Sequence, residues 1–287
     1  FVGLSATPQR LDGRGLREQF GALVQGPSPR WLIDNGFLAE YRLFAPSLGA
    51  NLDGVGEVAG DFDKRALAEV MDRSVIIGDA VANYRQIAPG SRAVVFCASV
   101  RHSEHVVEAF RAAGFVAVHI DGAMPLRDRA MAIEAFRSGR IQILSNVDLI
   151  GEGFDLPAIE TAILLRPTKS LAIYLQQVGR ALRPSPGKTR AVILDHAGNA
   201  MRHGLPCVER EWSLDATKRK RGQKAPAPPL RQCPSCFALN AIAAAKCAEC
   251  GHVFVVESRE IEQVDGSLQE VDHTAIRARA QSSLGTM

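Results

Sequence analysis

The chain has 287 residues, of which 46% are hydrophobic and 23% are charged. This composition is typical of a folded globular protein and excludes a disordered or collagen-like chain. The formal net charge is +3, but residues 216–231 contain six basic residues and no acidic one, which indicates an anionic partner at that segment. No apolar run reaches the ~18 residues of a membrane span, and no basic stretch followed by an apolar one opens the chain, so we expect a cytoplasmic protein.

The first predicted element is a strand at residues 1–4, whose continuously apolar sequence is typical of a buried strand. Because the first residue is Phe1 and not Met, and these residues are unlike a frayed terminus, we expect the chain to be a fragment. Up to residue 90 the pattern then predicts, in order, a helix at 30–35, a strand at 41–46, a glycine-rich loop at 49–60 and a long helix at 62–87 with Asp61 as its candidate cap.

Strand and helix patterns alternate regularly from residue 93 to residue 195. The predicted strands are 93–98, 116–120, 141–145, 159–165 and 191–195, and the helices are 102–113, 126–138, a short one near 148, and 171–180. Short apolar strands that alternate with helices predict a parallel sheet covered on both faces. The expected fold class is therefore α/β.

The periodicity fades after residue 199, where a basic segment rich in proline and alanine predicts an extended linker. A compact cysteine-bearing unit and a weakly structured tail follow. We expect five regions, namely 1–40 as the end of a first domain with a connector, 41–200 as the α/β domain, 201–231 as connector and linker, 232–256 as the cysteine unit and 257–287 as the tail.

A pair of arginines marks the end of the helix predicted at 171–180. Arg180 and Arg183 are three residues apart in the segment QQVGRALR, so they share one helical face if the helix persists, and both guanidinium groups can address one anionic ligand. Taken alone, the same pair also fits a solvated helix surface.

Three further segments carry weaker signals. In the loop GEGFDLP, Gly153 allows close backbone approach and Asp155 could accept a ribose hydroxyl. Ser5 and Thr7, directly after the first strand, also fit ordinary turn and cap positions. The segment Gly-Lys-Thr at 187–189 imitates the end of a phosphate-binding loop, but Leu182 stands where that loop needs its first glycine, so we assign none.

In this order, and each beside a strand, the segments SAT, GEGFD and QQVGRALR resemble the later motifs of superfamily two helicases and translocases. The resemblance continues through VVFCASVRHSEHVVEAF, through residues 121–129 and through RPTKSLAIYLQQVGRALRP, and it covers residues 1–200. The chain looks most like DEAD/DEAH-type helicases. The resemblance implies that residues 41–200 are the second of two RecA-like domains, with helices on both faces of a parallel sheet.

In that family ATP and Mg²⁺ are held between two RecA-like domains. The resemblance implies that an N-terminal RecA-like domain of the same protein supplies the phosphate-binding loop, and that Arg180 and Arg183 are arginine fingers with Gln176 beside them. It further implies nucleotide contacts by Gly153, Asp155 and Gly179, and coupling to nucleic acid by Ser5, Thr7 and Arg129.

Two details qualify these assignments. Arg129 also fits an ordinary surface position on its helix. Val147 stands where many relatives carry a threonine that contacts a backbone phosphate, so Ser145 or Asn146 is the candidate for that contact.

Two CxxC pairs form the second strong motif, Cys233 with Cys236 and, after ten residues, Cys247 with Cys250. Four thiolates at this spacing suit tetrahedral Zn²⁺, and Gly251 after the second pair permits a tight turn. The unit resembles a zinc ribbon. Reduced free thiols or a redox pair are the alternatives.

These observations predict the C-terminal part of an ATP-dependent nucleic-acid helicase, with ATP, Mg²⁺ and Zn²⁺ as cofactors and DNA as the expected polymer. Without a phosphate-binding loop the chain alone should be inactive. A translocating ATPase of the restriction or remodelling type that never unwinds, and a nonenzymatic docking module, are the alternative functions.

Overall fold

The computed structural model describes residues 2–8, 15–45, 52, 54–58, 60–72, 74–149, 159–215 and 230–254. All of these residues belong to one compact unit, Phe1–Phe254. The predicted tail, the basic linker at 216–229 and the loop that contains Gly153 and Asp155 lie outside the described residues.

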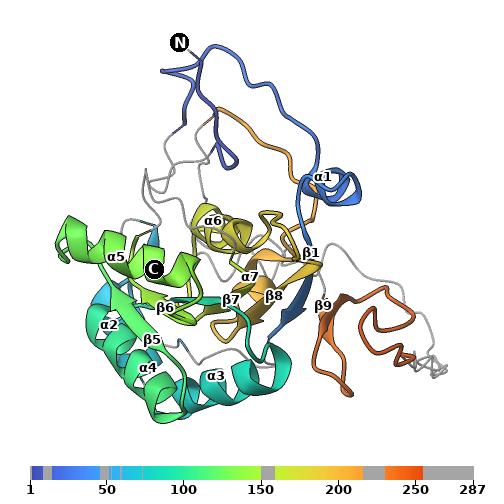
Figure 1. Ribbon diagram of the computed structural model, residues 1–287. Helices are drawn as coiled ribbons and strands as arrows, with labels where there is room; N and C mark the ends of the chain where they lie inside the picture. The colour runs from blue at the N-terminus through green and yellow to red at the C-terminus, as the bar shows by residue number, and fades with distance from the viewer. Residues whose placement is uncertain are drawn as a thin grey trace, which may run out of the picture. The chain divides into compact units, whose positions relative to one another are not determined.

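Six parallel strands form one sheet in the order β1-β8-β7-β4-β6-β5 (Figure 1). The predicted α/β fold with a parallel sheet is thus confirmed. The strands are β1 (Glu40–Phe44), β4 (Ala93–Phe96), β5 (Ala117–Ile120), β6 (Ile143–Asn146), β7 (Thr161–Leu164) and β8 (Arg190–Asp195).

The helices in the described residues are α1 (Pro29–Asp34), α2 (Lys64–Met71), α3 (Ser74–Ile87), α4 (Val100–Ala112), α5 (Leu126–Arg137), α6 (Leu171–Ala181) and α7 (Asn199–His203). Four of them, α3 to α6, cover the two faces of this sheet. One core cluster joins the sheet to α3 and α4, and a second joins it to α5 and α6 (Figure 1). This burial on both faces explains why the strands read as unbroken apolar runs. None of the helices in the described ranges is long and apolar enough to cross a membrane.

The prediction of a buried strand at residues 1–4 is wrong for the residues described. Val2 and Leu4 are 91% and 96% exposed, and residues 2–4 pair with none of the described strands. An extended segment is stable as a strand only when neighbouring strands complete its hydrogen bonds.

The predicted helix at 62–87 is in fact two helices. α2 ends at Met71 with Asp72 as its C-cap, and α3 begins at Ser74. The Asp72 side chain contacts α4, since its carboxylate lies 2.7 Å from His105 Nδ1. The cap of α2 is Asp63, which accepts the Ala66 N–H at 2.8 Å, and not Asp61.

Asp61 instead belongs to a small hairpin of β2 (Glu57–Val58) and β3 (Asp61–Phe62). The short helix predicted near residue 148 is absent from the residues described there. Asp148 has a φ of 52°, in the left-handed region that ends helices.

Residues before α1 lie against residues that follow α7. The N–H groups of Leu16 and Arg17 donate to the Leu214 carbonyl at 2.7 and 3.2 Å, and Arg17 Nε pairs with Asp215 at 2.5 Å. A hollow of about 290 Å³ lies here, and its lining includes Arg17, Gly21, Trp212 and Leu214. Neither Arg180 nor Arg183 lines this hollow.

Candidate functional site

The helix α6 follows β7 and carries most of the candidate residues. Its N-cap is Ser170, whose hydroxyl accepts the Ile173 N–H at 3.3 Å. Tyr174 and Val178 on its inner face are buried in the core beneath α5 and α6. This anchoring leaves Gln176 exposed and Gly179 and Arg180 half-buried on the remainder of the helix surface.

The two arginines do not share one continuous helix. α6 ends at Ala181 with Leu182 as its C-cap, so Arg180 lies in the last turn whereas Arg183 lies beyond the helix and is exposed. Gln176 and Arg180, four residues apart, do share a helical face. The candidate site therefore comprises one helical face and the turn that follows it.

Thr7 lies beside this face. Gln176 Nε2 is 3.5 Å from Thr7 Oγ1, a contact between residues 169 positions apart. Thr7 is 7% exposed, and its N–H donates to the Ser5 hydroxyl at 3.1 Å. The structure thus brings the SAT segment against the helix α6.

Gly179 has no packing requirement for glycine among the described residues. A Cβ atom added there would meet none of the described atoms within 4 Å. The described residues therefore leave open space beside the backbone at Gly179. Gly153 and Asp155, the other predicted nucleotide contacts, lie outside the described residues.

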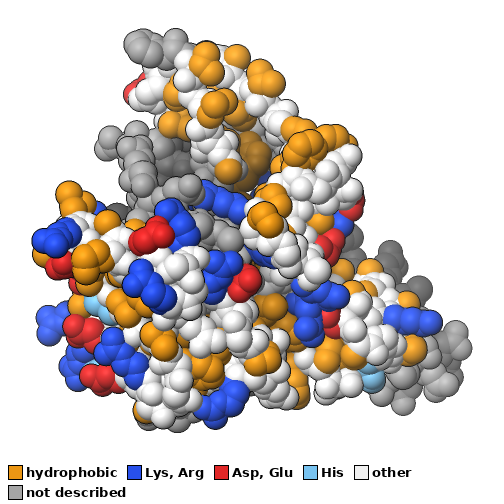
Figure 2. Space-filling view, in the orientation of Figure 1, with side chains coloured by type: hydrophobic (Ala, Val, Ile, Leu, Met, Phe, Trp, Pro, Cys, Tyr) orange, Lys and Arg blue, Asp and Glu red, His pale blue; other side chains and the backbone are white. Residues whose placement is uncertain are grey.

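Arg129 is half-buried on α5, which packs against the same sheet face as α6. The turn before α5 is held by Asp121, whose carboxylate accepts the N–H groups of Ala123 and Met124 at 2.8 and 2.9 Å. Lys and Arg side chains gather over this part of the surface (Figure 2). An anionic ligand would meet positive charge from both helices.

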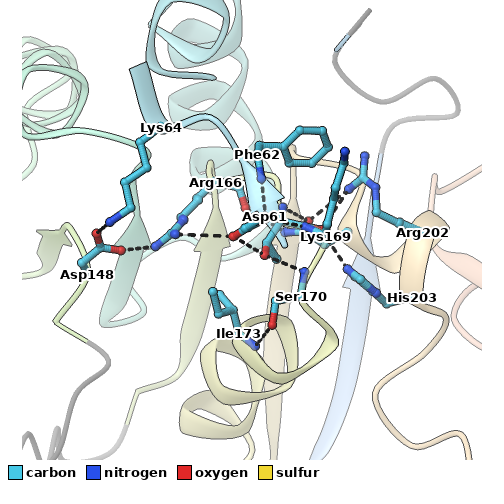
Figure 3. A network of polar contacts seen from close by, with 12 residues as sticks. Asp61, Phe62, Lys64, Asp148, Arg166, Lys169, Ser170, Ile173, Arg202 and His203 are labelled. Atoms are coloured by element: carbon cyan, nitrogen blue, oxygen red, sulfur yellow. Dashed lines mark hydrogen bonds and ion pairs between the residues drawn. The ribbon is translucent and has the colours of Figure 1, made fainter. Parts of the chain in front are cut away.

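A polar network that the sequence did not reveal fixes the chain before α6 (Figure 3). The Asp61 carboxylate accepts the Thr168 hydroxyl at 2.9 Å and the Lys169 N–H at 2.7 Å. The Phe62 ring lies under two cations, with Lys169 Nζ 4.9 Å and Arg202 Cζ 5.2 Å from its centroid. The β2–β3 hairpin thereby fastens the segment that leads into the arginine helix.

Arg166 connects this network to the end of β6. Its guanidinium bonds to the Asp148 carboxylate and lies 3.6 Å from Asp61, while Lys64 Nζ pairs with Asp148 at 2.6 Å (Figure 3). Burial alone would raise the pKa of Asp148, but its bond to Lys64 and the charges of Arg166 and Lys64 outweigh burial and lower it. Asp148 therefore stays ionised where the chain leaves β6.

The four predicted metal ligands lie together. Their Sγ atoms all lie within 4.8 Å of one another, and the separations Cys233–Cys250 and Cys236–Cys247 are both 3.6 Å. Tetrahedral Zn²⁺ with bonds of about 2.3 Å requires sulfurs about 3.8 Å apart, so the four thiols fit this ion. Burial opposes ionisation of Cys247, but the N–H groups of Cys250 and Glu249 lower its pKa to about 6, which favours the thiolate that binds metal.

The two CxxC segments, each called a knuckle below, end in turns of the same conformation. The residue after each second cysteine has a positive φ, 61° at Phe237 and 72° at Gly251. A hairpin of β9 (Leu230–Gln232) and β10 (Leu239–Ala241) flanks the first knuckle. The turn expected at Gly251 is thus present, and Phe237 adopts the same conformation without being glycine.

The cysteine unit also contacts the edge strand β1. Ala238 forms an antiparallel bridge with Phe44, Gln232 bonds to the Ala45 carbonyl, and Glu249 pairs with Arg42 at 2.5 Å. Cys233, Cys247 and Phe254 belong to the same core cluster as Phe44. The unit is packed on the sheet and does not have a core of its own among the described residues.

Comparisons with known proteins found several relatives of this chain. Residues 76–185 match the family described as helicase conserved C-terminal domain. A Lactococcus phage protein named "51.5 kDa protein" is 34% identical over 285 residues, which cover 98% of this chain and 62% of the relative. The Saccharomyces cerevisiae protein named "Putative ATP-dependent helicase IRC3" is 27% identical over 200 residues, covering 69% of this chain and 29% of the relative.

A solved fragment of a protein named "putative HsdR subunit of a type I restriction enzyme", from Vibrio vulnificus YJ016, has the same fold. It aligns with a TM-score of 0.54 and 23% identity and covers 69% of this chain and 39% of that one. The chain thus spans 62% and 29% of the two curated relatives. Residues 76–185 therefore match the helicase conserved C-terminal domain family in sequence, and the parallel-sheet domain that contains them has the fold of the solved fragment.

Proposed function

We propose that this chain is the C-terminal part of an ATP-dependent nucleic-acid helicase or translocase, in which Arg180 and Arg183 are arginine fingers. The observation that carries the proposal is the contact of Thr7 with Gln176, because it joins in one site two motifs that this family uses around ATP. The helicase C-terminal family match and the relative named as an ATP-dependent helicase support it.

Phosphoryl transfer explains why arginines suit this place. As the γ-phosphoryl group transfers to water, negative charge spreads over its oxygens, and a planar guanidinium can bind two of them at once. Arg180 and Arg183 supply two such groups at the end of α6. Gln176 and Gly179, and with them Gly153 and Asp155, would lie beside the nucleotide.

ATP and Mg²⁺ require a second set of residues. Mg²⁺ would neutralise the β- and γ-phosphate oxygens, but the sequence has no phosphate-binding loop with an acidic partner motif. We therefore assign both to another RecA-like domain. This domain and the chain together are called the parent protein below.

The test of the proposed function is ATP hydrolysis with and without nucleic acid. Residues 1–287 alone should not turn over ATP, whereas the parent protein should, with stronger stimulation by single-stranded DNA than by RNA of the same sequence. A parent protein inactive with every nucleic acid would reject the enzyme in favour of a docking module. Stimulation by RNA alone would reject DNA as the polymer.

The basic linker is the proposed site of backbone contact, with Ser5, Thr7 and Arg129 coupling nucleic acid to ATP. Changing Lys218, Arg219, Lys220 and Arg221 to glutamine should weaken binding of all sequences alike, because phosphate contacts carry no sequence information. The dependence of log K on log salt should flatten by about 0.7 for each single-strand phosphate that the variant no longer neutralises. A changed sequence preference at an unchanged slope would contradict this role.

We also propose that Cys233, Cys236, Cys247 and Cys250 bind one Zn²⁺, supported by the sulfur separations described above. Thiolates must remain reduced to hold the ion, which favours the cytoplasm as the compartment.

A further inference from the structure

The turn between α6 and β8 contains a lysine whose side chain reaches back to the end of α6. Lys188 Nζ donates to the carbonyl oxygens of Ile159 at 2.7 Å and Arg183 at 2.9 Å, and it also bonds to the carbonyl oxygen of Ala181. An ammonium group has three N–H donors. All three of those on Lys188 therefore have main-chain acceptors.

These bonds satisfy carbonyls that the helix itself leaves open. The last carbonyls of a helix have no intrahelical partner, and a cation near them is favourable. Lys188 holds those of Ala181 and Arg183, and the Ala39 N–H donates to that of Leu182 at 2.7 Å. Three consecutive carbonyls are thus held from outside the helix, directly after Arg180.

The resemblance of residues 187–189 to a phosphate-binding loop has a structural explanation here. Gly187 has a φ of 79°, which lets the chain turn. This turn places Lys188 against the main-chain carbonyls of Ala181 and Arg183. With Ile159 as the third acceptor, all N–H donors of Lys188 are used and none is left for a phosphate.

We propose that Lys188 is a positioning residue for the arginine fingers. By holding the carbonyls of Ala181 and Arg183, it fixes where the guanidinium groups of Arg180 and Arg183 meet the transferred phosphoryl group. The proposal rests on the proposed function, and it assigns Lys188 no contact with ATP.

The pKa of Lys188 predicts how ATP hydrolysis should depend on pH if this lysine positions the arginines. Burial lowers the pKa of Lys188 to about 8, the Glu160 carboxylate opposes that shift, and Arg92 adds to it. Glu160 and Arg92 precede β7 and β4, and the carbonyls at the end of α6 do not titrate. Above pH 8 the amine keeps two N–H groups for three carbonyls, so hydrolysis should fall.

Stability should change in the opposite direction. The unfolded chain keeps the Lys188 proton up to its usual pKa of 10.5. Between pH 8 and 10.5 the unfolded state binds more protons, so the contribution of Lys188 to the free energy of unfolding rises with pH. A lysine with only a structural role would not lower activity in the range where stability increases.

The experiment uses the parent protein with Lys188→Met. The expected kcat is about 10²-fold lower, as for a displacement of about 1 Å at a reacting centre, with KM for ATP nearly unchanged. Affinity for ADP with aluminium fluoride, which imitates the transition state, should fall in parallel, whereas affinity for ADP alone should not. Only folded protein binds either ligand. The ratio of the affinity for ADP with aluminium fluoride to the affinity for ADP alone therefore does not depend on the fraction of protein that is folded.

Arg85→Met is the matched control. The Arg85 guanidinium donates to the carbonyl of Ala113, the C-cap of α4 on the other face of the sheet, at 3.0 Å. This variant also loses a cation bonded to a helix end, and its kcat should equal that of the parent protein. Equal losses in both variants would overturn the proposal.

Lys188→Arg tests the role if Lys188→Met fails to fold. Arginine keeps its charge, so this variant should lack the fall in activity above pH 8. An unchanged alkaline fall, or an unchanged ratio of the two affinities in Lys188→Met, would overturn the positioning role alone. A parent protein without ATPase activity would instead overturn the proposed function, and with it this inference.

Discussion

Changing Arg180 or Arg183 to alanine should lower kcat for ATP hydrolysis by the parent protein about 10³-fold or more. An arginine finger acts on charge that develops only in the transition state, so its loss leaves ground-state binding largely intact. Adenine and the inner phosphates would be held by the other RecA-like domain. We therefore expect the affinity for ATP to change little.

Lysine at either position should restore little activity, because a point charge cannot reproduce the planar fork of guanidinium. Arg137→Ala is the matched control, since Arg137 lies in the last turn of α5 as Arg180 does in the last turn of α6, and it pairs with Glu134 at 2.9 Å. The measurement is steady-state hydrolysis with nucleic acid bound. Near-parental rates for both alanine variants would refute the finger assignment and favour the docking module.

The strands of the α/β domain were predictable because both faces of the sheet are buried. The four residues of β4 are at most 3% exposed, and such a strand gives an unbroken apolar run. Each predicted strand of this sheet differs from the observed one by at most two residues at either end. The order β1-β8-β7-β4-β6-β5 was not predictable. An apolar run identifies a strand but does not indicate which other strands lie beside it.

Two of the wrong predictions, the continuous helix at 62–87 and Asp61 as its cap, arise from tertiary contacts that override a local pattern. The apolar periodicity of residues 62–87 continues through Asp72. The helix α2 nevertheless ends there, where the Asp72 carboxylate binds His105. Asp61 and Asp63 are equally good caps by composition. The structure uses Asp63 for α2 and commits Asp61 to Thr168 and Lys169, more than 100 residues away.

The candidate site depends on local sequence patterns in the same way. Motif spacing singles out Gln176, Arg180 and Arg183, because these residues follow one another on and after a single helix. The contact of Gln176 with Thr7 and the bonds of Lys188 to the end of α6 link distant segments or main-chain atoms. No spacing rule encodes either of them.

The cysteine unit shows a similar contrast, since the CxxC spacing predicted that the four cysteines lie together but not what surrounds them. A unit beyond a linker suggests independent folding, yet Ala238 bridges to Phe44 and Glu249 pairs with Arg42 on β1. An edge strand exposes unpaired main-chain groups unless something covers it. The cysteine unit covers the end of β1, so loss of the metal should also affect the α/β domain.

Chelation of zinc, or Cys247→Ser, should remove the metal and unfold residues 232–254. Zinc in such small sites contributes about 10–16 kcal/mol of apparent binding free energy, which is the folding free energy of the unit. The α/β domain should stay folded but melt at lower temperature, because β1 loses its partners. Metal content and calorimetry of residues 1–287 measure both effects.

Two variants separate metal binding from packing on β1. Cys207→Ser, outside the four-cysteine cluster, should keep one zinc per chain, since a serine hydroxyl can still accept from Tyr41 as the Cys207 thiol does at 3.0 Å. Glu249→Gln should keep the zinc but lose the ion pair with Arg42. A loss of about 1 kcal/mol would lower the midpoint by about 2–4 °C. Undiminished zinc in Cys247→Ser would reject the four-thiolate site, and an unchanged midpoint on chelation would reject the coupling to β1.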